Sequence, residues 1–93
     1  MIRGFKDKMT EAVFHGRRPK GFSADTFPVT RRKLLSLHFA SDLTDLRSPP
    51  ANRLEALSKD RSGQHSIRVN DQFRISLPRT SAGPEDVEFV DHR

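Results

Sequence analysis

The chain lacks cysteine, tryptophan and tyrosine, and it has no long hydrophobic run. Without cysteine it can form no disulfide, thiolate nucleophile or cysteine zinc knuckle, which is typical of a protein in a reducing cytoplasm. A membrane helix needs about 20 consecutive apolar residues, and the richest patch, residues 34–40, is interrupted by Ser36 and His38. The opening MIRGFKDKM has no apolar run followed by a small-residue cleavage site, so it predicts no secretory signal. We expect a soluble, cytoplasmic protein with no membrane partner.

Apolar residues are few and basic residues are many. Of the 93 residues, 33% are apolar and 31% are charged, so we expect a single domain, residues 1–93, with one compact core. The formal net charge is +5, and all of the excess lies in residues 1–47, which contain ten Lys or Arg against five acids. This surplus favours an anionic partner, such as nucleic acid, a phosphate-rich assembly or an acidic protein, although solubility alone would also explain it.

The first half of the chain has helical spacing. Residues 2–5 can make a short strand, and residues 6–15 have the apolar spacing of a short amphipathic helix. A second helix is predicted to begin at Asp25 or Thr26, either of which can cap it, and to end near Ala40. This second helix is amphipathic and basic.

The second half alternates with a period of two residues. A strand is predicted around residues 53–57, and strict alternation over residues 65–69 and 73–77 predicts a hairpin. A final strand, residues 87–91, follows a turn around Gly83-Pro84. Two helices followed by antiparallel strands indicate an α+β fold.

The hairpin register follows from the need to bury one face. A two-residue loop would turn the apolar set of one strand outward. A three-residue loop, Asn70–Gln72, instead places Ile67 opposite Ile75, and it also places Arg68 opposite Arg74. We therefore expect both guanidinium groups to be exposed on the face of the sheet that is not in the core.

Two opposed arginines repel each other and destabilise the strand pair by a few tenths of a kcal/mol or more. One explanation is a nearby acid that offsets the repulsion, for which the candidates are Glu55, Glu88 and Asp91. The other is a bound phosphate, which a pair of guanidinium forks would hold well. The sequence leaves both open.

Three segments are similar to known toxins. They are MIRGFKDK at the start, RLEALSKDRSGQHSIRVNDQFRI from Arg53 to Ile75, and DVEFVDHR at the end. Together they resemble the RelE/ParE superfamily, and its HigB branch more closely. The resemblance implies the toxin of a type II toxin–antitoxin system, with an N-terminal strand and two helices packed on one face of a curved antiparallel sheet. The other face would carry the active-site cations.

The resemblance also implies a ribosome-dependent endonuclease that cuts messenger RNA in the ribosomal A site. The expected chemistry is attack of a 2′-hydroxyl on the adjacent phosphodiester, with neither a metal nor a cofactor. The histidines agree with this, because they lack the close paired spacing of a metal motif; they are His15, His38, His65 and His92.

The catalytic residues are carried over by position. Arg74 matches the family's arginine and would stabilise the pentavalent phosphate, with Arg68 assisting. Glu55 stands where the family has a histidine and would act as general base, or it would only form a salt bridge with an arginine. Asp91 and His92 stand where the family ends in a catalytic cluster, although the chain has Asp-His-Arg in place of Asp-Tyr-His, and an inert tail would look the same. His65 alternates with core residues, so we interpret it as structural.

Several basic residues would contact RNA phosphates. Lys59 and Arg61, in the loop before the hairpin, match basic positions of the family and would track messenger RNA and 16S ribosomal RNA. Three residues of the first inter-helix loop would extend that surface: Arg17, Arg18 and Lys20. The second helix adds Arg31, Arg32 and Lys33. A solvated basic face explains any one of them equally well.

The resemblance also implies a protein partner, a cognate antitoxin of the HigA-like helix-turn-helix kind, through which the toxin would reach operator DNA indirectly. Two alternatives stay open because two catalytic side chains differ from the family's. One is a ParE-like toxin that inhibits DNA gyrase without cutting RNA. The other is an inactive homologue that only binds RNA or regulates.

Overall fold

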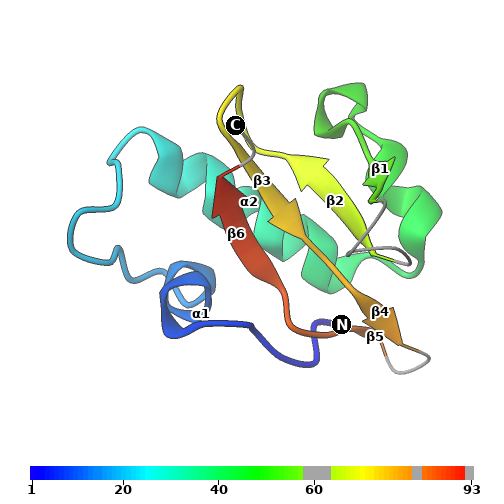
Figure 1. Ribbon diagram of the computed structural model, residues 1–93, viewed down its shortest axis with the longest axis horizontal. Helices are drawn as coiled ribbons and strands as arrows, with labels where there is room; N and C mark the ends of the chain where they lie inside the picture. The colour runs from blue at the N-terminus through cyan, green and yellow to red at the C-terminus, as the bar shows by residue number, and fades with distance from the viewer. Residues whose placement is uncertain (58–63, 81–82, 92–93) are drawn as a thin grey trace.

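The computed structural model describes residues 1–57, 64–80 and 83–91. Its helical elements are α1 (Lys8–Phe14), α2 (Thr26–Phe39) and the 3-10 helices η1 (Leu43–Arg47) and η2 (Pro50–Asn52). Its strands are β1 (Glu55–Ala56), β2 (His65–Arg68), β3 (Phe73–Ser76), β4 (Arg79–Thr80), β5 (Gly83–Pro84) and β6 (Glu88–Asp91). A four-stranded antiparallel sheet has the order β1-β2-β3-β6, and β4 pairs with β5. Figure 1 shows α2 lying across one face of the sheet, which confirms the predicted α+β class.

The predicted first strand is not a full strand. Residues 2–5 run extended beside the chain that leads into β6, and their ladder is a single parallel bridge between Phe5 and Val87. Backbone hydrogen bonds from Arg3 N to the Pro84 carbonyl (2.7 Å) and from Lys6 N to the Val87 carbonyl (2.9 Å) hold this segment. The pairing ends there because Asp7 caps α1, where its Oδ1 accepts from the amide of Thr10 at 2.7 Å.

Helix α1 protects the edge of the sheet at β6. The side chain of Thr10 is fully buried, and its Oγ1 accepts a hydrogen bond of 3.1 Å from the backbone amide of Phe89. An outward amide of an edge strand is otherwise a template for pairing with another chain. Val13, one turn further along α1, is fully buried in the core. The short helix therefore both closes the sheet edge and contributes to the core.

Helix α2 begins where the sequence predicts, but the cap is different. Asp25 makes no capping hydrogen bond through its side chain. Instead the Oγ of Ser23 accepts from the amides of Asp25 (3.2 Å) and Thr26 (3.3 Å). The buried side of α2 has the spacing of a single helical stripe; it comprises Thr30, Lys33, Leu34 and Leu37. A lysine in this stripe is unusual, because charged side chains are rarely buried unless they are paired.

The predicted hairpin register is confirmed. Ile67 pairs with Ile75 and Arg68 with Arg74, and Ile75 pairs in turn with Phe89 of β6. The three-residue loop is closed by Asn70, whose Oδ1 accepts from the amides of Gln72 (2.9 Å) and Phe73 (2.8 Å). The core between sheet and helices includes Val13, Leu34, Leu37, Leu46, Ile67, Val69, Ile75, Leu77 and Val87.

Two details of the second half differ from prediction. The strand expected at residues 53–57 is only Glu55–Ala56, because Arg53 has a left-handed backbone with φ 45° and breaks the extended run. Gly83 and Pro84, predicted as a turn, instead form β5 and pair with β4. A Cβ at Gly83 would lie 2.6 Å from the carbonyl oxygen of Met1, so glycine is required where the N-terminal segment crosses. In the part of the chain described, no helix is long and apolar enough to cross a membrane.

Candidate functional site

One face of the sheet, opposite to the core face, gathers three of the predicted catalytic residues, Glu55, Arg68 and Arg74. The register aligns Glu55, Ser66 and Ser76 across three strands, and Arg68 with Arg74 two residues along. Because side chains alternate along a strand, all five lie on the side that faces away from Ile67 and Ile75. The sequence prediction that Arg68, Arg74 and Glu55 come together is therefore supported by the strand pairing.

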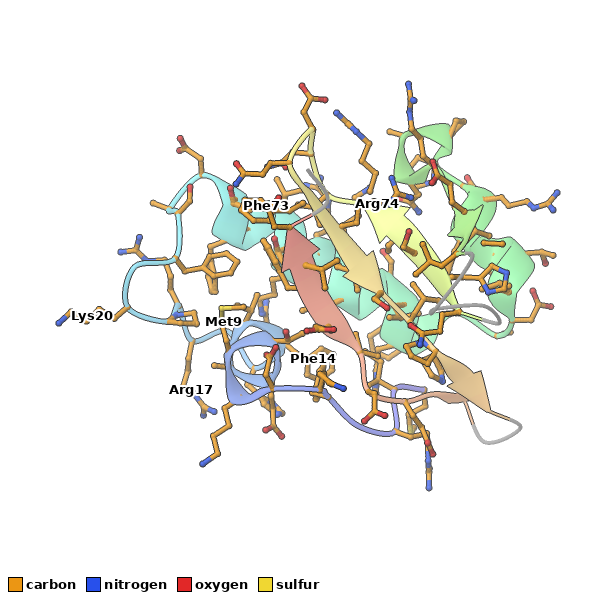
Figure 2. All side chains as sticks on the ribbon, viewed as in Figure 1. Met9, Phe14, Arg17, Lys20, Phe73 and Arg74 are labelled. Carbon is orange, nitrogen blue, oxygen red and sulfur yellow. The ribbon has the colours of Figure 1, made fainter. Side chains whose placement is uncertain are left out.

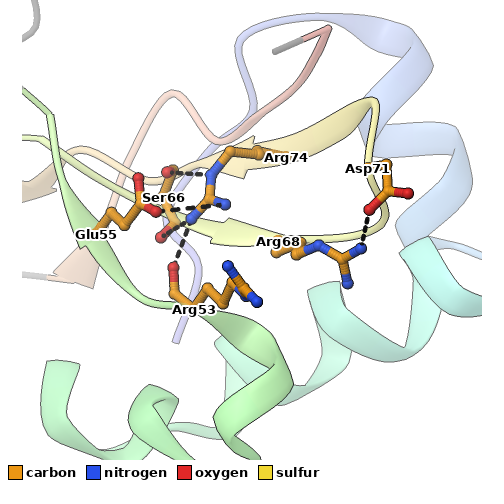
Figure 3. Close-up of polar contacts among 6 residues, drawn as sticks. All are labelled: Arg53, Glu55, Ser66, Arg68, Asp71 and Arg74. Carbon is orange, nitrogen blue, oxygen red and sulfur yellow. Dashed lines mark hydrogen bonds and ion pairs between the residues drawn. The ribbon is translucent and has the colours of Figure 1, made fainter. Parts of the chain in front are cut away.

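Arg74 is fixed in one orientation by hydrogen bonds. Its Nε donates to the Oγ of Ser66 (2.8 Å), and its Nη2 donates to the carbonyls of Arg53 (2.5 Å) and Ser66 (3.2 Å). Figure 3 shows the guanidinium lying between β2 and the segment that leads into β1. The residue is only 4% exposed, so the expectation of an exposed side chain was wrong. The reason is that the chain from Arg53 to Glu55 folds over it, which the hairpin pattern does not contain.

Glu55 supplies the negative charge nearest to this group among the described ion pairs. Its Oε1 lies 4.0 Å from Nη1 of Arg74, and its side chain is 52% exposed. Burial lowers the pKa of Arg74, Glu55 raises it, and Arg68 and Arg53 lower it further. A guanidinium keeps its proton in proteins despite such shifts. Arg74 is thus a permanent, oriented cation, and Glu55 is a carboxylate that solvent or a substrate can reach.

Arg68 points toward the hairpin loop. It forms an ion pair with Asp71, a fully exposed residue three positions later in the chain. Exposed pairs of this kind contribute roughly 0 to 1 kcal/mol, so an anion could replace Asp71 at little cost. Figure 3 shows Arg53 and Arg68 next to each other at the same side of the hairpin. Three guanidinium groups therefore converge within this part of the molecule.

The prediction that Lys33 extends an exposed basic surface is wrong, because its amine is buried beside this region. This residue is 8% exposed, and its Nζ donates to the Oδ1 of Asn52, itself 1% exposed. Burial, and then the charges of Arg32 and Arg68, lower the pKa of Lys33 below its ordinary value of 10.5. The helical stripe that contains Leu34 and Leu37 was the signal that could have found it, because Lys33 falls within that stripe.

Asn52 connects Lys33 to the chain around η2. Its Nδ2 donates to the carbonyls of Leu46 (3.1 Å) and Ser48 (3.4 Å), so one buried amide ties α2, η1 and η2 together. Arg53 follows directly, and its carbonyl is the acceptor that orients Arg74. The network from Lys33 through Asn52 therefore positions the segment that holds the guanidinium.

The electrostatic balance of this region is positive. Four cations lie in this region: Lys33, Arg53, Arg68 and Arg74. Besides burial, the charge of Arg68 lowers the pKa of both Lys33 and Arg74, and the charge of Arg53 lowers the pKa of Arg74. The ion pairs of the described residues set two carboxylates against them, from Glu55 and Asp71. An acid that offsets the repulsion between Arg68 and Arg74 is thus present, as one of the two explanations predicted. The four cations still outnumber these two carboxylates, which suits an anionic ligand.

The remaining predicted residues do not join this cluster. Asp91 pairs in register with Phe73, so its side chain lies on the opposite face of the sheet, where Gln72 Nε2 donates to its Oδ2 at 3.2 Å. Arg17 and Lys20 lie on the loop between the helices, at the other end of the molecule from Arg74 (Figure 2). Arg18, on the same loop, donates to the carbonyl of Phe22 at 3.2 Å. Three predicted residues lie outside the described part of the chain: Lys59, Arg61 and His92.

His65 lies at the edge of the core, half-buried, beside a cavity of about 420 Å³. The other residues that line this cavity are Leu43, Thr44, Arg47, Leu54 and Ala56. This cavity does not include Arg68 or Arg74, so it does not bring His65 to the cation cluster. Within residues 1–57, 64–80 and 83–91, no group of three histidine, aspartate or glutamate side chains is arranged to hold a metal ion.

Comparison with known proteins identifies the family. A model of the RelE-like toxin of the type II toxin–antitoxin system HigB matches residues 3–87. The chain belongs to this HigB-like family. It is 39% identical to Toxin HigB-1 of Vibrio cholerae over 76 residues, which are 81% of this chain and 80% of that protein. It is 42% identical to an uncharacterized protein of Haemophilus influenzae over 50 residues, 54% of this chain and 50% of that protein.

Membership of the HigB-like family implies a partner, and the matched range shows which part of the chain the family shares. As the toxin of a toxin–antitoxin pair, it has a cognate antitoxin as partner. The matched range includes the four cations and Glu55, but it ends at residue 87, before Asp91 and His92. The cation cluster thus belongs to the part of the chain that the family shares.

Proposed function

We propose that this toxin is a cytoplasmic, ribosome-dependent endoribonuclease that cleaves messenger RNA and so stops translation. The observation that supports this most directly is the guanidinium of Arg74, which three hydrogen bonds hold beside Arg53, Arg68 and the exposed carboxylate of Glu55. A cation that is oriented before the substrate arrives stabilises developing charge without the cost of reorganisation.

The proposed reaction is an internal transfer within RNA. The ribose 2′-oxygen attacks the adjacent phosphorus, the bond to the 5′-oxygen breaks, and a 2′,3′-cyclic phosphate forms. Glu55 accepts the proton of the 2′-hydroxyl, and Arg74, assisted by Arg68, neutralises the charge on the phosphorane. A proton must also reach the leaving 5′-oxygen, for which His92 remains our candidate. Asp91 has no part in this scheme because its side chain lies on the opposite face.

Binding to the ribosome is proposed to rest on two basic residues that precede the hairpin in the sequence. Lys59 and Arg61 precede the hairpin that carries Arg68 and Arg74, so they would contact messenger RNA and 16S ribosomal RNA in the A site. Arg17 and Lys20 lie at the other end of the molecule from Arg74 (Figure 2), so we assign no ribosome contact to the loop that carries them and Arg18. The antitoxin is proposed to be a HigA-like helix-turn-helix protein that brings the toxin to operator DNA.

The experiment that tests the nuclease is primer extension on messenger RNA after the toxin is induced. Wild type should leave discrete cuts within translated codons. Arg74→Lys keeps a charge but cannot reproduce the forked contacts to Ser66 and Arg53, so we expect a loss of cleavage of at least about 100-fold, in the range reported for removing one oriented donor. Glu55→Gln should lower cleavage similarly and change its pH dependence.

Lys6→Ala is the matched control, because Lys6 is an exposed cation beside α1 and has no part in the proposed site. It should cleave like wild type. Melting temperatures of all variants must be compared, since Arg74 also ties β2 to the chain before β1. Full cleavage by a folded Arg74→Lys protein would remove Arg74 from the mechanism. Intact transcripts together with inhibited DNA gyrase would instead favour the ParE-like alternative.

A further inference from the structure

An apolar groove lies between the two helices and the far end of the sheet. Its lining comes from α1, the inter-helix loop, the start of α2, β3 and β6, and comprises Met9, Gly21, Phe22, Ser23, Thr26, Phe73 and Phe89. The groove encloses about 250 Å³. Figure 2 shows Met9 on the side of the molecule that carries Arg17 and Lys20. Phe73 lies on the face of the sheet opposite to that of its neighbour Arg74, because side chains alternate along β3. This groove is therefore separate from the cation cluster.

The walls of the groove are built from aromatic rings that already contact one another. The ring of Phe89 lies 5.0 Å from that of Phe22 and 4.5 Å from that of Phe73, measured between centroids. The Phe22 contact is edge to face, at 81°. Single-stranded RNA binds proteins by stacking its bases on open ring faces, and these packed rings offer a slot for an apolar side chain instead.

The mouth of the groove is open and has apolar residues at it. Met9 is 39% exposed, which is high for a long apolar side chain next to a core. Gly21, at the same mouth, is exposed, and a Cβ placed on it would meet nothing within 4 Å. Ligand pockets for drug-sized molecules run from about 300 to 1,000 Å³. The volume here suits one or two side chains of a protein partner.

The rim of the groove is basic. Residues 16–24 contain Arg17, Arg18 and Lys20 and no acid. All three are exposed, and Arg18 donates a hydrogen bond to the carbonyl of Phe22, which lines the groove. Interfaces place potentials of opposite sign against each other, so the segment that fills this groove should be acidic around an apolar anchor.

We infer that this groove is a docking site for the cognate antitoxin, which inserts an apolar side chain between Met9, Phe22 and Phe73 and places flanking acids against Arg17 and Lys20. The proposed occupant is the antitoxin because the chain is the toxin of a toxin–antitoxin pair. The basic rim and the packed aromatic walls of the groove suit an acidic protein segment better than RNA. The inference does not depend on the nuclease activity, and it explains basic residues that the RNA site leaves unused.

The test is isothermal titration of the purified antitoxin into toxin variants. Met9→Glu places a carboxylate at the mouth and should weaken binding at least tenfold, while growth arrest without antitoxin stays as in wild type. Phe39→Glu is the matched control, because Phe39 is 76% exposed at the far end of α2, and it should change the affinity less than twofold. Lys20→Glu is a second variant on an exposed residue, and it should weaken binding with a loss that shrinks as salt is added.

Unchanged antitoxin affinity in Met9→Glu and Lys20→Glu would overturn the inference. Two other results would overturn it by naming a different occupant. In one, Met9→Glu converts a toxin dimer to monomers at unchanged antitoxin affinity, which would identify a second copy of the chain. In the other, Met9→Glu and Lys20→Glu weaken RNA binding but leave the antitoxin affinity unchanged, which would identify RNA. Loss of cleavage in Arg74→Lys with normal antitoxin binding would leave the inference standing, so the two proposals fail separately.

Discussion

Removing the side chain of Asn52 should loosen both the fold and the candidate site. Asn52→Ala deletes one hydrogen bond from a charged amine, that of Lys33, and two to backbone carbonyls, those of Leu46 and Ser48. A bond to a charged group contributes about 1.5 to 3 kcal/mol and a neutral one about 0.5 to 1.5. Allowing for the long 3.4 Å contact to Ser48, we expect a loss of about 3 kcal/mol in the free energy of unfolding.

The same change also acts on Arg74, since Arg53 follows Asn52 in the chain and its carbonyl orients the guanidinium. For a domain of this size about 3 kcal/mol corresponds to a melting temperature lower by roughly 12 to 24 °C. Because the chain has no tryptophan, unfolding is best followed by circular dichroism in urea. Cleavage measured well below the melting temperature should fall as well.

Lys33→Met is the matched control for this network. It removes the donor but also a buried charge that is costly to desolvate, so we expect it to destabilise by about 1 kcal/mol or less. The double variant should be more stable than the sum of the two single effects predicts, by at least about 1 kcal/mol, because both changes break the same contact. Additive effects, or a loss below about 1 kcal/mol in Asn52→Ala, would refute the reasoning.

Two further predictions follow from the fold. Because the pKa of Lys33 is lowered from 10.5, the unfolded chain binds more protons than the folded one between the folded pKa and 10.5. The free energy of unfolding of wild type relative to Lys33→Met should therefore rise as the pH rises through that window, and urea titrations that give a constant difference would contradict this. Thr10→Val leaves the amide of Phe89 without its acceptor and should cost about 1 to 3 kcal/mol, with faster hydrogen exchange at that amide, whereas Thr10→Ser should keep both near wild type.

Much of the hairpin could be predicted because its apolar residues leave one consistent register. Ile67 and Ile75 must share the buried face, and a shift by one residue would expose one of them. That requirement places Arg68 opposite Arg74, as the structure has it. The alternation of side chains then decides the face on which the two arginines lie, so this part of the site follows from local pattern alone.

The burial of Arg74 could not be predicted in the same way. Its acceptor on Arg53 lies 21 positions earlier in the chain, and Arg53 reaches it through a left-handed backbone at the end of η2. Nothing in an alternating pattern contains such a contact. Lys33 was expected on an exposed basic surface of the second helix, although its place beside Leu34 in the helical stripe pointed inward. Polar residues inside an apolar stripe are therefore the positions to inspect first.

The bond between Thr10 and Phe89 has a consequence for how the protein is made. Its two partners are separated by 79 positions, so the edge of the sheet cannot be closed until residue 89 has left the ribosomal exit tunnel. Contacts between residues so far apart in sequence are slow to form, because the chain must lose conformational entropy before the contact contributes any favourable free energy. A newly synthesised molecule thus has no finished sheet, and cannot become competent, until residue 89 has emerged.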